Sequence, residues 1–391
     1  VVPDEPEDAE QGLQLVGVVA MADPPRESAA VAIRESRSAG ITPVMITGDH
    51  QLTATAIAKR LDMLDDTRES ITGAELAKIS DEELAERVRT IGVYARTNPE
   101  QKLRIVDAWR KQGAVSAMTG DGVNDAPALR KADIGVAMGI TGTDVSKEAS
   151  DMILEDDDFS TIVAAVEEGR RIYANIRRFV RYLLTTNSAE VMVMVAAPFL
   201  GLPLPLLAIQ ILWINLVTDG APALSLGVEP AHPRAMKQPP RNPNASILGG
   251  GLWKHALWVG LLMTVITLAV QSWSYNGGAS EETWRTLVFT TLAFMQLSHA
   301  LVVRSDRESI LTLGFASNRP LFIVLIISSL VQLSLVYVPF LQPIFETTAL
   351  TATELLVVAL AATIPFVAVE LEKWVRRRRE PGEPAETPAT T

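Results

Sequence analysis

The chain has 391 residues, 48% of them hydrophobic, and contains no cysteine. Residues 1–169 carry 32 acidic and 17 basic side chains, whereas residues 170–391 carry 14 and 18. An acidic part joined to an apolar, mildly basic part excludes a nucleic-acid binder, whose footprint is a basic patch. The lack of cysteine excludes disulfide bonds, thiolate metal sites and a thiol nucleophile.

Residues 1–169 alternate short β-rich runs with amphipathic patterns. The expected strands lie at residues 13–21, 42–48, 91–97, 114–120, 133–139 and 151–157. Helical patterns cover residues 26–40 and 99–113. This alternation predicts an α/β fold in which helices cover both faces of a parallel sheet.

Two Thr-Gly-Asp motifs follow expected strands: Thr47-Gly48-Asp49 and the run that begins at Thr119. Ligands of parallel sheets bind beyond the carboxyl ends of the strands, where threonine and backbone N–H groups can hold phosphate oxygens. Asp121 and Asp125 are hard oxygen ligands suited to Mg²⁺. Lys102 can neutralise a phosphoryl charge. Taken singly, each motif is explained as well by a tight turn or a solvated charge.

Six apolar stretches follow residue 178, each close to the roughly 20 residues that a helix needs to cross a bilayer. They are residues 179–200, 204–226, 252–271, 284–303, 321–341 and 350–371. Buried helices of a large soluble protein would show polar stripes at helical spacing, and these stretches do not. The second part is therefore predicted to span a lipid bilayer.

Basic residues indicate the orientation of these spans, because cytoplasmic loops retain Lys and Arg. Arginine and lysine gather before the first span, after the second, after the fourth and after the sixth, while the loops between contain almost none. Six spans with both ends in the cytoplasm fit this alternation. The acidic first residues do not resemble a signal peptide, and the last residues, EPGEPAETPATT, are expected to form a disordered tail.

Polar side chains occur inside the first two spans, where a charged group is costly unless it has a function or a partner. Asn187 and Glu190 are three residues apart on the first span. Asn215, Thr218 and Asp219 share one side of the second, and the short turn between the spans makes the two helices antiparallel neighbours. We expect the helix to loosen after Asp219, because a glycine and a proline follow. Carboxylate, amide and hydroxyl oxygens suit a hard cation such as Ca²⁺; a buried hydrogen-bond network between the two helices is the alternative.

Four motifs together resemble the P-type ATPases of the haloacid-dehalogenase superfamily. They are MADPPRESA, MITGD, YARTNPEQK and TGDGVNDAPALRKADIGVAMG, in the order of that family. The resemblance implies a Rossmann-like, haloacid-dehalogenase-like sheet that uses ATP and Mg²⁺, followed by an all-α six-helix transmembrane domain. The residues implied for phosphate contact are Thr47, Gly48, Asp49 and Lys102; for Mg²⁺ and phosphate, Asp121, Asn124 and Asp125; and for the hinge and nucleotide side, Arg96, Asp23 and Arg26.

The phosphorylated aspartate of that family lies in a DKTG motif, and no such string occurs in these 391 residues. We therefore expect the C-terminal part of a pump, unable to phosphorylate itself, with the upstream part of the same pump as partner. Residues 1–169 then form part of a cytoplasmic phosphorylation domain. Residues 170–372 form the last six of ten membrane helices, and residues 373–391 a basic anchor and tail.

The pattern NxxE followed by NLVTDG resembles the calcium-pump subgroup. It implies one ion site from Asn187, Glu190, Thr218 and Asp219, and a contribution of Asn215 and Asp219 to a second. Gln296 stands where the two-site calcium pump has a glutamate. The expected function is export of Ca²⁺ through an aspartyl-phosphate cycle, in a prokaryotic plasma membrane. The alternatives are a pump for H⁺, Na⁺ or Mg²⁺, and an inactive phosphatase-like domain on a membrane anchor.

Overall fold

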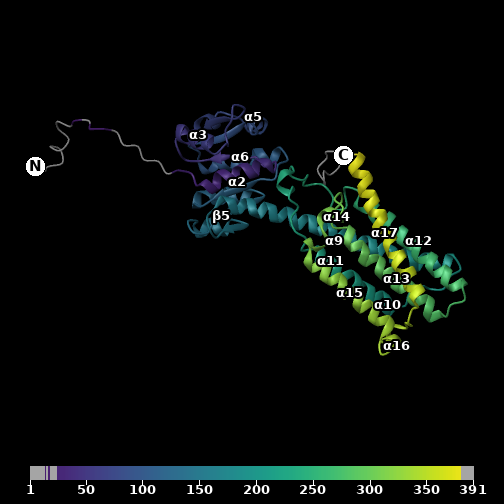
Figure 1. The fold of residues 1–391 in the computed structure, drawn as a ribbon. Helices are drawn as coiled ribbons and strands as arrows, with labels where there is room; N and C mark the ends of the chain where they lie inside the picture. Colours follow the sequence, from purple (N-terminus) through teal and green to yellow (C-terminus); the bar gives the residue numbers. More distant parts are fainter. Residues whose placement is uncertain (1–13, 15, 18–23, 380–391) are drawn as a thin grey trace, which may run out of the picture. The chain divides into compact units, whose positions relative to one another are not determined.

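The computed structural model describes residues 14, 16–17 and 24–379 (Figure 1). Their contacts divide the chain into two compact units. Unit 1 consists of Val1–Arg34 and Pro43–Ser160, and unit 2 of Glu35–Thr42 and Thr161–Thr391. The strand expected at residues 13–21 lies mostly outside the described residues, and so does the tail from residue 380 onward.

Unit 1 contains two three-stranded sheets in which every pairing is parallel. The strands are β1 (Met45–Ile46), β2 (Glu69–Thr72), β3 (Ile91–Ala95), β4 (Ala117–Gly120), β5 (Ile134–Met138) and β6 (Met152–Leu154). One sheet has the order β1-β3-β2 and the other the order β4-β5-β6. The predicted haloacid-dehalogenase-like α/β fold with parallel strand pairing is confirmed. The short polar strand β2 was not predicted, because ESIT shows no apolar run.

The helices of unit 1 lie between and beside these strands. They are α2 (Glu27–Ser38, in unit 1 up to Arg34), α3 (Gln51–Arg60), α4 (Gly73–Leu76), α5 (Asp81–Arg87), α6 (Pro99–Lys111), α7 (Ala126–Lys131) and α8 (Asp144–Glu148). Helix α6 starts at a capping box, in which Asn98 and Gln101 bond reciprocally, with proline at its first position. Ile105 of α6 packs in the cluster with Ile91 of β3, while Val106 packs with Met118 of β4. The two sheets therefore share α6 as part of their cores.

Unit 2 is helical. Its long helices are α9 (Phe159–Phe199, in unit 2 from Thr161), α12 (Leu252–Asn276), α13 (Glu281–Val302), α15 (Arg319–Tyr337) and α17 (Ala352–Arg379). A further helix consists of α10 (Ala208–Trp213), the π-helical segment η2 (Ile214–Asp219) and α11 (Gly220–Leu226). Short helices α14 (Ile310–Leu313) and α16 (Gln342–Phe345) lie in loops. Each of the six predicted spans overlaps one of the long helices, and α17 includes residues 373–379, which were expected to belong to a separate basic anchor.

Four of these helices are long and apolar enough to cross a membrane: Ala208–Leu226, Leu252–Asn276, Arg319–Tyr337 and Ala352–Arg379. The count of six spans is not confirmed, because α9 and α13 fall outside this set. Both carry polar side chains, and in α13 these are turned inward: Thr290, Thr291 and Gln296 are fully buried. Phe289, Leu292 and Met295 of α13 pack in the central cluster of the bundle.

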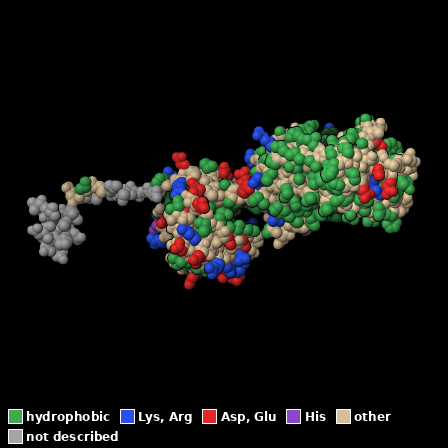
Figure 2. Space-filling model, turned by 90° about the horizontal axis from the view of Figure 1, so that it is seen from below, with side chains coloured by type: hydrophobic (Ala, Val, Ile, Leu, Met, Phe, Trp, Pro, Cys, Tyr) green, Lys and Arg blue, Asp and Glu red, His purple; other side chains and the backbone are tan. Residues whose placement is uncertain are grey.

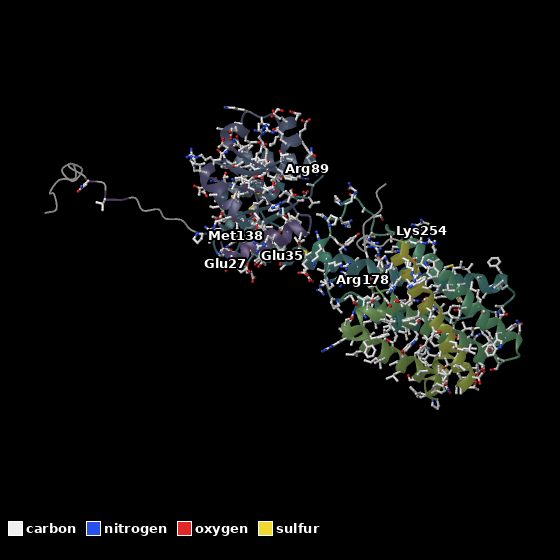
Figure 3. All side chains as sticks on the ribbon, turned by 45° about the horizontal axis from the view of Figure 1, so that its top comes forward. Glu27, Glu35, Arg89, Met138, Arg178 and Lys254 are labelled. Atoms are coloured by element: carbon white, nitrogen blue, oxygen red, sulfur yellow. The ribbon has the colours of Figure 1, made fainter. Side chains whose placement is uncertain are left out.

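The surface of unit 2 is apolar along its length. Hydrophobic side chains cover the face seen in Figure 2, and charged side chains gather toward its ends. Arg178, where the apolar part of α9 begins, and Lys254, in the first turn of α12, lie at the same end of the bundle (Figure 3). This basic end agrees with the charge pattern that predicted the orientation of the helices.

Candidate phosphate and cation sites

The turn Thr47–Asp49 is held against the carboxyl end of β3. The Thr47 N–H donates to the Tyr94 carbonyl at 2.9 Å, and the Thr47 carbonyl accepts from the Thr97 N–H at 3.2 Å. The Asp49 N–H donates to the Thr47 hydroxyl oxygen at 3.1 Å. These bonds leave Gly48 and Asp49 exposed at the strand end. The motif therefore presents short side chains and backbone groups to a ligand.

Lys102 and Asp125 form an ion pair between α6 and the turn after β4. The Lys102 Nζ lies 2.5 Å from Asp125 Oδ1, and the two side chains are 18% and 9% exposed. The Gly122 N–H donates to Asp125 Oδ2 at 3.2 Å. A Cβ on Gly120 would lie 2.5 Å from the Asp125 Cβ, so only glycine permits this approach. The structure thus brings together two residues that the sequence implicated separately.

Asp121 and Asn124 have exposed side chains beside this pair. The Asp121 carbonyl accepts from the Thr143 N–H at 2.9 Å and from the Ser146 hydroxyl at 3.1 Å. Among the described residues, nothing is hydrogen-bonded to the Asp121 carboxylate. The backbone of Asp121 is therefore fixed while its carboxylate stays available to a ligand.

Asp157 holds the turn that leads to Thr143. Its carboxylate accepts from the Ile140 N–H at 3.0 Å and from the Thr141 N–H and hydroxyl at 2.8 and 2.7 Å. The bond from the Ile140 N–H is the main cause that lowers the pKa of Asp157 to about 2. Arg26 donates to the Asp157 carbonyl at 3.0 Å, which places this predicted residue beside the turn.

The remaining residues predicted for this site are placed as follows. Arg96 is exposed, has a left-handed backbone (φ 51°), and its N–H donates to the Asp49 carbonyl at 3.1 Å. Asp23 lies outside the described residues. No group of three or more His, Cys, Asp or Glu side chains able to hold a metal occurs within the described part of the chain. A Mg²⁺ ion here would rest on Asp121 and on oxygens of phosphate and water, since Asp125 already pairs with Lys102.

Glu190 is the centre of a second polar cluster, in the bundle of unit 2. Asn215 donates from Nδ2 to Glu190 Oε2 at 2.9 Å, and Gln296 donates from Nε2 to Glu190 Oε1 at 2.8 Å. Glu190 is 5% exposed and Gln296 is fully buried. Three separate helical segments, α9, η2 and α13, therefore contribute to one carboxylate.

Asp219 joins the same cluster from η2, and its carboxyl group is close enough to interact with that of Glu190. Tyr182 of α9 donates to the Thr218 carbonyl at 3.0 Å and lies 3.4 Å from Asp219 Oδ1. Pro222 has no N–H to offer the Thr218 carbonyl one turn earlier, so Tyr182 supplies the donor. The helix departs from α-helical geometry before Asp219 and not, as was expected, after it: the π-helical segment ends at Asp219, and regular α-helix resumes at Gly220. Such π-helical segments are frequent at functional sites.

Two oxygens of this cluster are buried without a hydrogen-bond partner among the described residues: Asp219 Oδ2 and Gln296 Oε1. Buried polar atoms are nearly always paired, so these two oxygens are available to a ligand. Thr218 bonds to the Ile214 carbonyl of its own helix at 3.0 Å. Asn187 is exposed and donates to the Leu183 carbonyl at 2.8 Å, so it is not joined to Glu190. Tyr182 was missed, although its spacing of eight residues from Glu190 places it on the same side of α9.

The parallel α/β unit with its Thr-Gly-Asp turns, and the helical unit with its buried carboxylates, agree with the P-type cation-transporting ATPases that the sequence motifs resemble. Residues 203–375 match the family described as cation transporting ATPase, C-terminus, and residues 2–133 match haloacid dehalogenase-like hydrolase. The predicted resemblance is confirmed, and the chain is a homologue of these ATP-hydrolysing ion pumps.

Within this class, the chain is similar to calcium-transporting ATPases. It is 45% identical to the calcium-transporting ATPase of Bacillus subtilis over 360 residues, which cover 92% of the chain and 40% of that relative. It is 42% identical to calcium-transporting ATPase 1 of Yarrowia lipolytica over 375 residues, covering 95% and 40%. It is also 42% identical to the human calcium-transporting ATPase type 2C member 1 over 369 residues, covering 94% and 40%. The chain therefore spans about 40% of the length of these curated relatives.

Proposed function

We propose that this chain provides the cation site, and part of the phosphate site, of an ATP-driven pump that exports Ca²⁺ across a membrane. The observation that carries the proposal is the cluster in which Glu190 and Asp219 meet Asn215 and Gln296. Two carboxylates with amide oxygens are the ligands that Ca²⁺ selects. The names of the relatives point to the same ion.

Within this proposal, Asp219 Oδ2 and Gln296 Oε1 are direct ligands, since neither oxygen has a hydrogen-bond partner among the residues that the structure describes. Glu190 is a further ligand, because each of its carboxylate oxygens can accept from one amide NH₂ group and still coordinate the ion with another lone pair. Tyr182 is a positioning residue, because it holds the Thr218 carbonyl and the Asp219 side chain. Asn187 and Thr218 complete the site only if their side chains rotate away from their own helices.

In unit 1, we propose that Thr47 and Gly48 contact the phosphoryl group, that Asp49 shapes the pocket and that Lys102 neutralises charge. Asp121, with Asn124 and Asp125 behind it, is proposed to hold Mg²⁺, which supplies positive charge to the phosphate oxygens when bound. Arg96, Asp23 and Arg26 are proposed to support the hinge and the ATP side.

The phosphorylated aspartate is proposed to come from a strand outside these 391 residues. β1 and β4 are edge strands of their sheets, and each leads into a Thr-Gly-Asp turn. Ile46 of β1 packs with Met118 of β4 in the cluster that contains Val106. A parallel strand inserted between β1 and β4 would place a nucleophilic carboxylate beside both turns.

The complete pump is proposed to lie in a prokaryotic plasma membrane with both ends of this chain in the cytoplasm.

Titration of Ca²⁺ into the purified chain tests the cation site directly. We expect one bound Ca²⁺, and a loss of at least tenfold in affinity for Glu190→Gln and for Asp219→Asn, because each removes a charged ligand. Glu282→Gln is the matched control: this exposed carboxylate near the start of α13 lies outside the cluster, and its loss should change the affinity less than twofold.

If the chain binds Na⁺ or Mg²⁺ in preference to Ca²⁺, and Asp219→Asn weakens that binding equally, the proposed ion is wrong but the proposed pump function stands. No binding of any cation, with both variants folded, would leave an inactive phosphatase-like domain on a membrane anchor as the better description.

In the complete pump, Asp219→Asn should abolish ion-dependent phosphorylation but preserve phosphorylation by inorganic phosphate. Asp121→Asn should instead weaken Mg²⁺-dependent turnover at unchanged ion affinity.

A further inference from the structure

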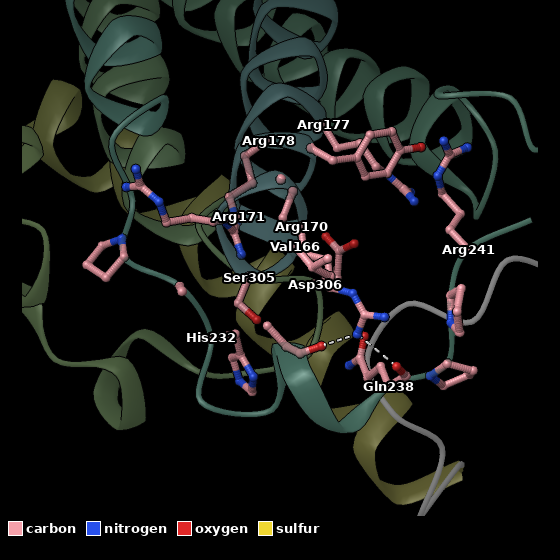
Figure 4. A pocket seen from close by; sticks show the side chains of 18 residues that line it. Val166, Arg170, Arg171, Arg177, Arg178, His232, Gln238, Arg241, Ser305 and Asp306 are labelled. Carbon is pink, nitrogen blue, oxygen red and sulfur yellow. Dashed lines mark hydrogen bonds between the residues drawn. The ribbon is translucent and has the colours of Figure 1, made fainter. Parts of the chain in front are cut away.

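A cavity of about 510 Å³ opens in unit 2 at the basic end of the helical bundle (Figure 4). Its walls come from α9 between residues 166 and 178, from the loop of residues 230–241 that leads toward α12, and from residues 305–306 after α13. It lies outside the carboxylate cluster of Glu190 and is lined by a different set of side chains. The cavity is therefore a separate candidate site.

The charges that line this cavity are mostly positive. Its arginines are Arg170, Arg171, Arg177, Arg178 and Arg241, and its acidic residue is Asp306. Arg181 donates to Asp306 Oδ2 at 2.6 Å and neutralises it. The excess of positive charge in the cavity favours an anionic ligand.

Three of the arginines have no carboxylate partner among the described residues. Arg170 donates to the carbonyls of Ala235, Gln238 and Ala39 at 2.6–2.8 Å. Arg177 donates to the Gly249 carbonyl at 3.1 Å, and Arg241 to carbonyls of its own loop. Burial lowers the pKa of Arg170 from its ordinary value, with no acidic neighbour to raise it. These carbonyl bonds hold the guanidinium groups in place without cancelling their charge.

Two donors in the wall are buried and lack a hydrogen-bond partner within the described part of the chain: the Tyr173 hydroxyl and the Arg177 Nε. Arg177 is only 7% exposed. The Arg241 guanidinium lies 4.3 Å from the centre of the Tyr173 ring, which keeps the tyrosine in position. An unpaired buried donor is costly, and an anion in the cavity would accept from both.

We propose that this cavity binds a phosphate group. Guanidinium groups match the geometry of phosphate oxygens in paired hydrogen bonds, and the Tyr173 hydroxyl adds a neutral donor. The cavity lies where the apolar part of α9 begins, which is the level of lipid headgroups on the cytoplasmic face under the proposed orientation. The phosphate can belong to an anionic phospholipid or to soluble inorganic phosphate, and the two sources are separable by experiment.

The purified 391-residue chain in an uncharged detergent is titrated with dioctanoyl phosphatidic acid, dioctanoyl phosphatidylcholine and inorganic phosphate, and heat is measured. We expect one phosphatidic acid to bind, with affinity that falls as salt rises. Phosphatidic acid binding at least tenfold tighter than inorganic phosphate identifies a lipid headgroup as the ligand. Equal affinity of the two, with mutual competition, identifies soluble phosphate. Phosphatidylcholine binding as tightly as phosphatidic acid would overturn the proposal, since acyl chains would then explain the heat.

Two variants test the assigned donors. Tyr173→Phe keeps the ring under Arg241 and removes only a hydroxyl that has no partner among the described residues, so we expect folding to be unaffected. It should weaken phosphatidic acid or phosphate binding about tenfold. Arg177→Gln should weaken it at least tenfold. Arg319→Gln removes the same charge from an exposed position at the start of α15 and should change the affinity less than twofold. No binding by the wild type, no effect of Tyr173→Phe, or an equal effect of Arg319→Gln would each refute the site.

Discussion

Replacing Lys102 by methionine tests how the phosphate site of unit 1 is held together. The substitution keeps an unbranched side chain in α6 but removes the ammonium group 2.5 Å from Asp125 Oδ1. The Asp125 carboxylate then keeps only the bond from the Gly122 N–H. Because its side chain is 9% exposed, water cannot replace the lost partner in full.

The size of the effect follows from burial. Breaking a fully buried ion pair costs about 3–5 kcal/mol, because a charge is left without a partner, whereas an exposed pair contributes at most about 1 kcal/mol. The Lys102 side chain is 18% exposed, so we expect a loss of about 2–3 kcal/mol in the stability of the β4–α7 region. The loss corresponds to an increase of roughly 30- to 150-fold in the opening equilibrium.

Hydrogen exchange of the backbone amides in β4 and β5 measures that equilibrium. Lys131→Met is the matched control, since Lys131 pairs with Asp107 at 3.2 Å while both side chains are almost half exposed. It should accelerate exchange less than about fivefold. The double variant Lys102→Met/Asp125→Asn should recover part of the loss, because the uncompensated charge is gone. Equal acceleration by Lys102→Met and Lys131→Met would refute the reasoning.

Three further substitutions address other parts of the molecule. Asp157→Asn should remove the acid sensitivity of the turn at residues 139–141, seen as hydrogen exchange at pH 5 and pH 3. The folded pKa of about 2 is below the unfolded value, so this carboxylate stabilises the turn above about pH 4 and its contribution is lost as the pH falls toward 2. Arg304→Met should lower thermal stability by about 3–5 kcal/mol, since Glu229, which accepts at 2.6 Å from Arg304, stays buried; an unchanged melting temperature would contradict this. Tyr182→Phe should weaken Ca²⁺ binding three- to tenfold with little loss of stability, measured by titration and melting; unaltered affinity would remove the positioning role.

Patterns between near neighbours in the chain predicted several parts of the structure. The helix predicted over residues 99–113, the strands with the IGVYA and IGVAM patterns, and the apolar helices of unit 2 all follow from local spacing. The Thr-Gly-Asp turns could also be placed at strand ends, because each motif directly follows residues with a strand pattern. Strand β2 could not be predicted, since it is held by pairing with β3, and its own residues have no strand pattern.

The amino-acid sequence by itself determined the class of the protein, through motifs whose residues are adjacent, and it determined which oxygens are available inside the apolar helices. Only the tertiary structure decided which of those oxygens meet. Gln296 bonds to Glu190, 106 residues away in the chain, and Lys102 pairs with Asp125, 23 residues away. Asn187 instead bonds to the Leu183 carbonyl of its own helix. The rotation of packed helices about their axes sets these distances, and that rotation depends on the whole interior. The arginine-lined cavity arises in the same way, from a stretch of α9, the loop of residues 230–241 and residues 305–306, which are far apart in the chain.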